Sequence, residues 1–417
     1  MTLADTSVDP LIRFSQAEGD AVDKLLAGAP ISSLETFSTE HQLLVERTVA
    51  GNANWYEFFP RSEGAKQNAD GSWVSGTFRT AAQRLPAVAK MGFNVLYMPP
   101  IHPIGTLNRK GPNNTLVTKP GDPGSPWAIG SADGGHDAIH PDLGDFKDFA
   151  FFVKEAKKNG IEVALDLALQ AAPDHPWVTT NPEFFTTLPD GTIAYAENPP
   201  KKYQDIYPVN FDNDPEGIRD EVLRVVLFWI SKGINIFRVD NPHTKPVHFW
   251  EWLIKTVNAQ HPDVVFLAEA FTRPAMMQAL AKVGFQQSYS YFTWRNTKWE
   301  LEEFFRSISG DTADFMRPNL FVNTPDILTE YLQFGGPAAF TIRATLAATA
   351  APLWGVYTGF ELFESVARPG AEEYIDNEKF EYKNRDWAAI EKEGSSLTPF
   401  LTTLNKIRAE HPALGQL

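Results

Sequence analysis

The sequence predicts an α/β protein that folds as a (β/α)8 TIM barrel, with long inserted loops after strands 2 and 3. From residue 54 onward, short apolar runs alternate with segments of helical period, a pattern typical of repeated βα units in a parallel sheet. Eight such runs and eight such segments complete one barrel. Three carboxylates also stand where predicted strands end, at Asp240, Glu269 and Asp326. Barrels gather their functional side chains at that end of the strands.

The elements follow in order along the chain. The predicted strands are Trp55–Phe59, Asn94–Met98, Glu162–Leu167, Asn235–Val239, Val264–Ala268, Gln286–Tyr291, Asn319–Val322 and Leu353–Tyr357. The predicted helices are Arg79–Lys90, Lys147–Lys158, Pro215–Lys232, Val247–Ala259, Ala275–Val283, Lys298–Ser307, Ala338–Ala350 and Leu397–His411. Gly92, Gly160 and Gly233 each stand between a helical segment and a strand, where glycine commonly ends helices.

The barrel is predicted to span residues 51–417, with loop insertions at about 100–146 and 170–214. Both loops are rich in Pro, Gly and Asn, and loops this long within a compact domain usually carry function. Their aromatic residues favour ordered loops over a disordered surface insertion. Residues 1–50 are helical in pattern, as in Asp20–Leu26 and His41–Arg47, and contain no strand of the barrel type. We interpret them as a helical lead-in that is part of a preceding domain.

Composition excludes several classes of function. A formal net charge of -15 argues against nucleic acid or an anionic membrane surface as the main partner, because both need a basic face. With no cysteine, the chain makes no disulfide and no thiolate metal site, which suits a reducing cytoplasm. His175 and His243 are too scattered to indicate a metal site. The sequence shows no apolar run of membrane-spanning length and no signal peptide at its start, so we expect a cytoplasmic protein without metal or cofactor.

The strand-end carboxylates indicate sugar chemistry. Residues two apart on a strand share a face, so Arg238 and Asp240 should both point into the mouth of the barrel. A guanidinium keeps a neighbouring carboxylate ionised, as a nucleophile at an anomeric carbon requires. Glu269 follows the apolar run Phe266–Ala268, which favours a raised pKa and an acid/base role. Each carboxylate alone is equally well explained by a structural ion pair, but the set favours retaining glycosyl transfer, which needs Asp240 and Glu269 about 5 Å apart.

Four stretches resemble the α-amylase family in order and spacing, namely Leu165–Gln170, Phe237–Asn241, Leu267–Ala270 and Val322–Asp326. The resemblance implies that Asp240 forms the covalent glycosyl-enzyme, that Glu269 is the general acid/base, and that Asp326 steadies the distorted sugar. Hydrolases of the family usually carry two histidines that hold sugar hydroxyls, at the places where this chain has Ala171 and Pro325. Their absence argues against plain amylase activity.

Longer stretches are similar to the maltose-1-phosphate maltosyltransferase branch of that family, namely Asn108–Asn114, Ala168–Trp177, Tyr195–Pro208 and Arg238–Pro246. The resemblance implies transfer of maltosyl units from α-maltose 1-phosphate to the non-reducing end of α-1,4-glucans, with release of phosphate. The substrate-binding residues implied are Lys110, Gln170, Asp205, Arg238 and Asn241 at the donor, Asn198, Lys201 and Tyr203 near its phosphate, and Lys379 with Phe380 over the maltosyl unit. The family commonly has Lys-Tyr at the last pair. Because phosphate leaves as an anion, it needs positive charge more than a proton, and two loop lysines, Lys110 and Lys201, would supply that charge.

Other expectations also rest on this resemblance. Members carry further amino-terminal domains and a carboxyl-terminal β-sandwich, so we expect a partial chain of a protein that is a homodimer when full length. Ser125 is expected to line the donor pocket, Asp166 to be structural, and His136 with Asp137 either to anchor a loop or to border the donor sugar. The alternatives are an α-glucan hydrolase, a phosphorylase-like or isomerising relative, and a non-catalytic glucan-binding barrel. Non-catalytic barrels tend to lose a catalytic carboxylate, whereas this chain keeps all three.

Overall fold

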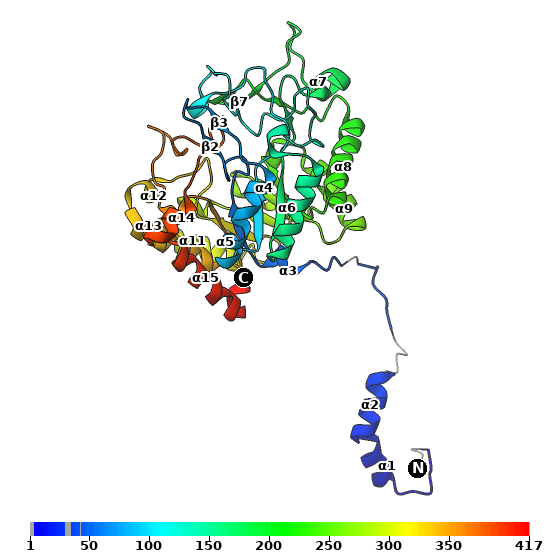
Figure 1. Cartoon of the computed structure of the whole chain (residues 1–417). Coiled ribbons are helices and arrows are strands. Elements are labelled where there is room, and N and C mark those ends of the chain that lie inside the picture. The colour runs from blue at the N-terminus through cyan, green and yellow to red at the C-terminus, as the bar shows by residue number, and fades with distance from the viewer. Residues whose placement is uncertain (1–3, 30–34, 42, 200, 417) are drawn as a thin grey trace. The chain divides into compact units, whose positions relative to one another are not determined.

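The larger part of the chain is a closed barrel of eight parallel strands, as the computed structural model shows for residues 4–29, 35–41, 43–199 and 201–416. Each strand pairs with its neighbours in chain order, and the last strand pairs with the first (Figure 1). The strands are β1 (Ala53–Glu57), β4 (Val95–Met98), β5 (Glu162–Leu167), β10 (Ile236–Asp240), β11 (Val265–Glu269), β12 (Gln287–Tyr289), β13 (Pro318–Phe321) and β14 (Leu353–Tyr357). The predicted fold class is confirmed.

Helical structure follows each barrel strand, as predicted. The elements are α4 (Phe78–Ala81) with α5 (Leu85–Lys90), α6 (Phe146–Lys158), α8 (Pro215–Ser231), α9 (Val247–Gln260), α10 (Pro274–Lys282), α11 (Lys298–Ser309), α13 (Gly336–Ala350) and α15 (Thr398–Glu410). The first predicted helix is divided by a 3-10 turn at Ala82–Arg84. Pro86 explains the break, because proline has no N–H to donate to the carbonyl of Ala82. The φ angles of Gly92, Gly160 and Gly233 are 84°, 72° and 94°, consistent with residues that end helices.

Two layers of buried side chains surround the strands. Trp55, Val95 and Leu267 belong to a cluster inside the barrel, whereas Tyr56 and Leu96 belong to the larger cluster packed against the helices. Burial on both faces explains why the strands read as nearly continuous apolar runs. The helical turn α3 (Thr48–Gly51) closes the amino-terminal end, where Gln287 Nε2 donates hydrogen bonds to the carbonyl oxygens of residues 49 and 50 at 2.8 and 3.3 Å.

The long loops after β4 and β5 contain ordered small elements. These are α7 (Pro176–Thr180), the pair β6 (Gln170–Ala171) with β9 (Tyr207–Pro208), and the hairpin β7 (Ala196–Asn198) with β8 (Lys201–Tyr203). Another hairpin, β2 (Lys66–Gln67) with β3 (Trp73–Val74), follows β1, and the short helices α12 (Glu330–Phe334) and α14 (Trp387–Glu393) complete the set. In Figure 1, α7, β7 and the β2–β3 hairpin lie at the end of the barrel opposite α3 and α15. The long loops therefore cover the carboxyl ends of the strands.

The chain divides into two compact units, Met1–Val45 and Glu46–Leu417. In the first unit, α1 (Pro10–Ala17) and α2 (Asp20–Gly28) bury no residue. The helical pattern at His41–Arg47 was a wrong prediction, because the described residues there form no helix. Leu43 and Val45 are exposed, and a short helix without a packed apolar face is only marginally stable. None of the helices in the described residues has both the length and the apolar character needed to cross a bilayer.

Candidate active site at the carboxyl ends of the strands

Arg238 is the centre of a charged group at the carboxyl ends of β5, β10 and β11. Its Nη1 donates hydrogen bonds to Asp166 Oδ2 at 2.9 Å and to Asp240 Oδ1 at 2.7 Å, and its Nη2 lies 3.6 Å from Glu269 Oε1. Strand register sets this arrangement, because Asp240 is paired with Glu269 and Arg238 with Asp166 on neighbouring strands. Both proposed catalytic carboxylates therefore lie beside one guanidinium. Their separation of about 5 Å stays a prediction.

Near neutral pH, Glu269 is present in both its charged and its neutral form. Burial raises its pKa to about 7, the Arg238 guanidinium opposes the rise, and the charge of Asp240 adds to it. Asn241, whose φ of 44° is left-handed, donates its backbone N–H to Glu269 Oε2 at 3.1 Å and its Nδ2 to Asp240 Oδ2 at 3.3 Å. A carboxyl group with this pKa exchanges protons near neutral pH, which suits a general acid/base.

Asp166 lies beneath this group with a side chain of zero exposure. Tyr97 OH donates to Asp166 Oδ2 at 2.5 Å, on the oxygen that also accepts from Arg238. Burial raises the pKa of Asp166 to about 7, and Arg238 opposes that rise. A carboxyl group without exposed surface cannot contact a sugar, so Asp166 holds Arg238 in place.

Asp326 stands in the turn after β13, beside a lysine from a distant loop. Lys379 Nζ donates to both carboxylate oxygens of Asp326, at 2.8 and 3.0 Å. Burial by itself raises the pKa of Asp326, but Lys379 and then Lys201 bring it below its ordinary value. The Lys379 ammonium also lies 4.9 Å from the centre of the Trp127 ring. Asp326 is therefore held ionised, with 44% of its side chain exposed.

The two loop lysines occupy different environments. Lys201, on β8, pairs with Glu373 Oε1 at 2.5 Å and keeps half of its side chain exposed. Lys110 is 3% exposed, and its Nζ donates to Gln204 Oε1 at 2.7 Å. Burial lowers the pKa of Lys110. Burial also raises the pKa of Asp205, and the positive charges of Lys110 and Lys379 oppose that rise. Lys110 is thus linked to the group around Asp326 through Asp205.

The remaining residues predicted to bind substrate lie mostly beside these groups. Gln170 Nε2 donates to the carbonyl oxygen of Trp127 at 3.2 Å. Burial raises the pKa of Tyr203, against the charges of Lys379 and Lys201. Phe380 is buried, with its ring centre 5.9 Å from Lys379 Nζ. Ser125 is also buried, whereas the side chain of Asn198 lies outside the described part of the structure.

Several residues at this end of the barrel were not predicted from the sequence. Tyr97 lies next to the last residue of β4, and Glu57 ends β1 with 2% exposure and no hydrogen-bond partner for its Oε2. Glu57 and Tyr97 lie inside the predicted strands Trp55–Phe59 and Asn94–Met98, so a rule for carboxylates at strand ends does not mark them. Trp127 and Glu373 lie in long loops outside the barrel strands, where no local pattern marks them.

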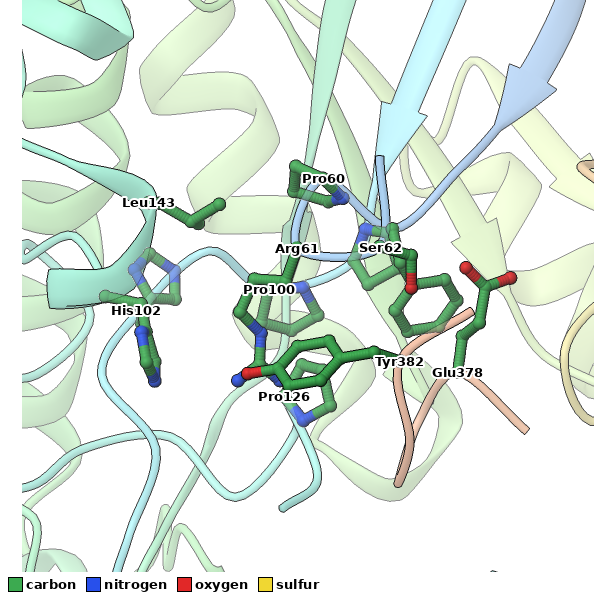
Figure 2. Close-up of a pocket in the computed structure, with 12 residues that line it drawn as sticks. Pro60, Arg61, Ser62, Pro100, His102, Pro126, Leu143, Glu378 and Tyr382 are labelled. Carbon is green, nitrogen blue, oxygen red and sulfur yellow. The ribbon is translucent and has the colours of Figure 1, made fainter. Parts of the chain in front are cut away.

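A pocket adjoins this site (Figure 2). Phe59 lines the pocket, and its ring packs edge-on against Trp127 with 6.1 Å between the ring centres. In Figure 2, Tyr382 and Arg61 point toward each other, while Glu378 lies at one edge. Arg61 Nη1 donates to the carbonyl oxygen of Pro123 at 3.3 Å. The strand-end carboxylates do not line this pocket, so it stands beside the site.

Comparison with known sequences identifies close relatives. No family model matches the chain. It is 58% identical over 416 residues to "Alpha-1,4-glucan:maltose-1-phosphate maltosyltransferase 2" of Streptomyces coelicolor, covering 100% of this chain and 61% of that protein. It is 60% identical over 413 residues to the maltosyltransferase of the same name, without the number, from Mycolicibacterium smegmatis, covering 99% of this chain and 59% of that protein. The chain thus spans about 60% of the length of these relatives.

Solved structures of α-amylases share the fold. The enzyme of Lactobacillus plantarum aligns with a TM-score of 0.64 at 22% identity, covering 88% of this chain and 82% of that one. The maltogenic α-amylase of Thermotoga neapolitana aligns with a TM-score of 0.65 at 20% identity, covering 89% and 79%. Likeness at such low identity shows the fold alone. Over almost its whole length, the chain is thus a homologue of the alpha-1,4-glucan:maltose-1-phosphate maltosyltransferases, and it has the fold of the α-amylases.

Proposed function

We propose that this barrel is the catalytic part of a retaining transferase that moves maltosyl units from α-maltose 1-phosphate to the non-reducing ends of α-1,4-glucans and releases phosphate. One observation carries the proposal: Asp240 and Glu269 end neighbouring strands beside the same Arg238 guanidinium. Two carboxylates so placed suit double displacement. The names of the related enzymes support the choice of donor and acceptor.

In the first step, an oxygen of Asp240 attacks the anomeric carbon of the donor. The bond between that carbon and the phosphate oxygen breaks, and phosphate departs with the bonding electrons. Asp326, held ionised by Lys379, steadies the positive charge that develops on the sugar ring. A covalent maltosyl–Asp240 ester remains.

In the second step, the 4-hydroxyl of the glucan acceptor attacks the same carbon. Glu269 takes the hydroxyl proton, and the bond to Asp240 breaks, so two inversions retain the configuration. A pKa of about 7 makes Glu269 available as a base near neutral pH.

Recognition of the donor falls to the polar residues of the loops. Lys110, Lys201, Asn198 and Tyr203 bind the phosphate side, and Lys379 with Phe380 covers the maltosyl unit. Gln170, Asp205, Arg238 and Asn241 bind or position the sugar. Three of the cationic residues lie around Asp326 and Asp205, which supports binding of an anionic donor.

We further propose that residues 51–417 form the catalytic domain and residues 1–50 form part of a preceding domain. The boundary between the two compact units, at residues 45 and 46, supports a division near this point. A cytoplasmic location and a homodimeric full-length protein complete the proposal. Fractionation of the source cells and size-exclusion chromatography with light scattering test these two points.

The deciding experiment incubates the protein with α-maltose 1-phosphate and a short maltooligosaccharide. Phosphate release that depends on the acceptor, with products that grow in steps of two glucose units, is the expected result. Efficient starch hydrolysis without phosphate would instead identify an α-glucan hydrolase. Asp240→Asn should abolish turnover without unfolding the protein, whereas Asp263→Asn, at an exposed turn before β11, should leave it unchanged.

Replacing Lys110 by Ala separates a phosphate-handling enzyme from a hydrolase. The variant should raise KM for α-maltose 1-phosphate at least about tenfold, because a buried cation no longer faces the donor site. A hydrolase acting on an uncharged glucan would show little change in KM. Circular dichroism of the variant checks that loss of the Lys110–Gln204 hydrogen bond has not unfolded the loops.

A further inference from the structure

Glu373 bridges two cations beside the proposed phosphate site. Its Oε1 accepts from Lys201 Nζ at 2.5 Å, and its Oε2 accepts from Arg368 Nη1 at 2.5 Å. The Glu373 side chain is 10% exposed. A carboxylate that presents one oxygen to each of two cations resembles a bound phosphate group in charge and in hydrogen-bond acceptors.

The two partners of Glu373 differ in exposure and in the number of contacts that hold them to it. Arg368 and Glu373 lie on one hairpin, where the Arg368 N–H donates to the carbonyl oxygen of Glu373 at 2.8 Å and Ala367 bridges Tyr374. Lys201 comes from a different hairpin, keeps 50% of its side chain exposed, and carries its charge on a flexible four-carbon stem. Glu373 is therefore fixed through Arg368, while Lys201 is free to turn away.

Lys201 also lies close to the donor site. Its charge contributes to lowering the pKa of Asp326, and Tyr203 lies within the electrostatic reach of Lys201, Lys379 and Glu373. By contrast, Lys379 is mostly buried and is bound by both oxygens of Asp326. Of the two lysines beside Asp326, Lys201 is the one able to exchange partners.

We propose that Glu373 is a positioning residue that binds Lys201 while the phosphate site is empty and competes with phosphate for this lysine. When a phosphate dianion arrives, as the donor ester or as inorganic phosphate, Lys201 swings from Glu373 to the phosphate, and Arg368 keeps the Glu373 charge paired. The competition weakens phosphate binding and so favours departure of the leaving group. This inference rests on the proposed function.

Replacing Glu373 by Gln tests the competition, because glutamine keeps the shape but removes the charge. Calorimetric titration with inorganic phosphate alone should show at least about fivefold tighter binding than in the unmodified chain, since an anionic competitor has been removed. KM for α-maltose 1-phosphate should fall in parallel while kcat does not rise. Glu373→Asp, which keeps the charge, should retain the weaker affinity.

Two controls sharpen the result. Glu197→Gln removes the carboxylate that pairs with Lys202 at 3.4 Å on the same hairpin, and it should leave phosphate affinity unchanged. In a chain that already carries Lys201→Ala, Glu373→Gln should no longer tighten phosphate binding, because the two residues act through one contact.

The outcomes separate this inference from the proposed function. Equal or weaker phosphate binding in Glu373→Gln, in a chain that still transfers maltosyl units, overturns the inference alone. An equal gain in Glu197→Gln also overturns it, because the effect would then be one of general charge. A chain that neither binds phosphate nor uses the donor overturns both.

Discussion

The Arg238 guanidinium lies beside three carboxyl groups at the strand ends. Arg238 binds Asp166 and Asp240 directly and approaches Glu269. Because one buried cation cannot stabilise three ionised carboxylates at ordinary pKa values, some of these groups hold their protons more tightly. Burial raises the pKa values of Asp166 and Glu269, each to about 7; Arg238 opposes the rise and the charge of Asp240 adds to it.

The pKa of Glu269 predicts the pH dependence of the second step. The base must be ionised, so kcat/KM for the glucan acceptor should rise with pH, with a midpoint near or below pH 7 and a plateau above it. The midpoint should lie at or below the value in the free enzyme, because esterification of Asp240 removes a negative charge that raises the pKa of Glu269. Steady-state kinetics with varied acceptor from pH 5 to 9 measure this profile.

The Glu269→Ala variant provides the control for this profile. It should lose the rise in kcat/KM with pH and recover turnover with azide, a nucleophile that needs no base. An acceptor profile that falls between pH 5 and 8 in the unmodified chain would contradict the assignment of Glu269 as base.

The raised pKa of Glu57 predicts that the stability of the fold changes with pH. Burial raises its pKa well above the ordinary value of 4.5, although Arg238 opposes the rise. The folded state therefore keeps this proton while the unfolded chain releases it, so the contribution is fully favourable below pH 4.5 and is lost as pH rises. Glu57→Gln should accordingly raise Tm over the unmodified chain by an amount that grows from pH 4 to pH 8. Glu393→Gln, at an exposed site, should show no such growth in thermal melts, and a pH-independent gain in Glu57→Gln would contradict the prediction.

At the scale of elements, a directed series of hydrogen bonds joins the two long loops. The N–H of Trp177 donates to His175 Nδ1, so His175 Nε2 carries the proton that it donates to His136 Nδ1 at 3.0 Å. His136 Nε2 then donates to the carbonyl oxygen of Ala168 at 2.9 Å, just after β5. Burial lowers the pKa of His175 to about 3, so this connection stays neutral at physiological pH.

The histidine connection requires a glycine at position 130, so a larger residue there should disrupt it. Its φ is 103°, and a Cβ there would lie 2.1 Å from His175 Cδ2. Gly130→Ala should therefore displace the loops, lower Tm and reduce kcat/KM for the donor about tenfold or more, because small shifts of positioning groups slow catalysis. Gly191→Ala is the matched control, with a φ of 85° and open space around the new methyl group. It should lower Tm slightly and leave kcat/KM unchanged, and equal kinetic losses in both variants would contradict the argument.

At the scale of the whole molecule, the buried core belongs to the larger unit. Its first buried residues are Val49 and Ala50, in the turn that closes the barrel. The helices α1 and α2 of the smaller unit contain no buried residue. Deleting residues 1–45 should consequently change the Tm of the barrel by less than about 3 °C, since Glu46–Leu417 is a compact unit of its own and the two helices removed bury no residue. Differential scanning calorimetry measures the change, and failure of the shortened chain to fold would contradict the prediction.

Local pattern was sufficient to predict the barrel and its central charges. The alternation of strand and helix segments located every barrel strand, and the spacing of Arg238 and Asp240 placed both on one face. The same rule missed Glu57, because the predicted strand continued to Phe59 whereas β1 ends at Glu57. The helix expected at residues 41–47 shows that an apolar period predicts a helix only where a packing surface exists.

The sequence by itself therefore determined the barrel and the placement of Asp240 and Glu269 at the ends of neighbouring strands, because strand period and the alternation of strands with helices are local patterns. Only the tertiary structure decided which loop residues reach the site. Lys379 meets Asp326 across 53 positions, and Glu373 meets Lys201 across 172. Irregular loops have no period, so their contacts depend on how the whole chain packs.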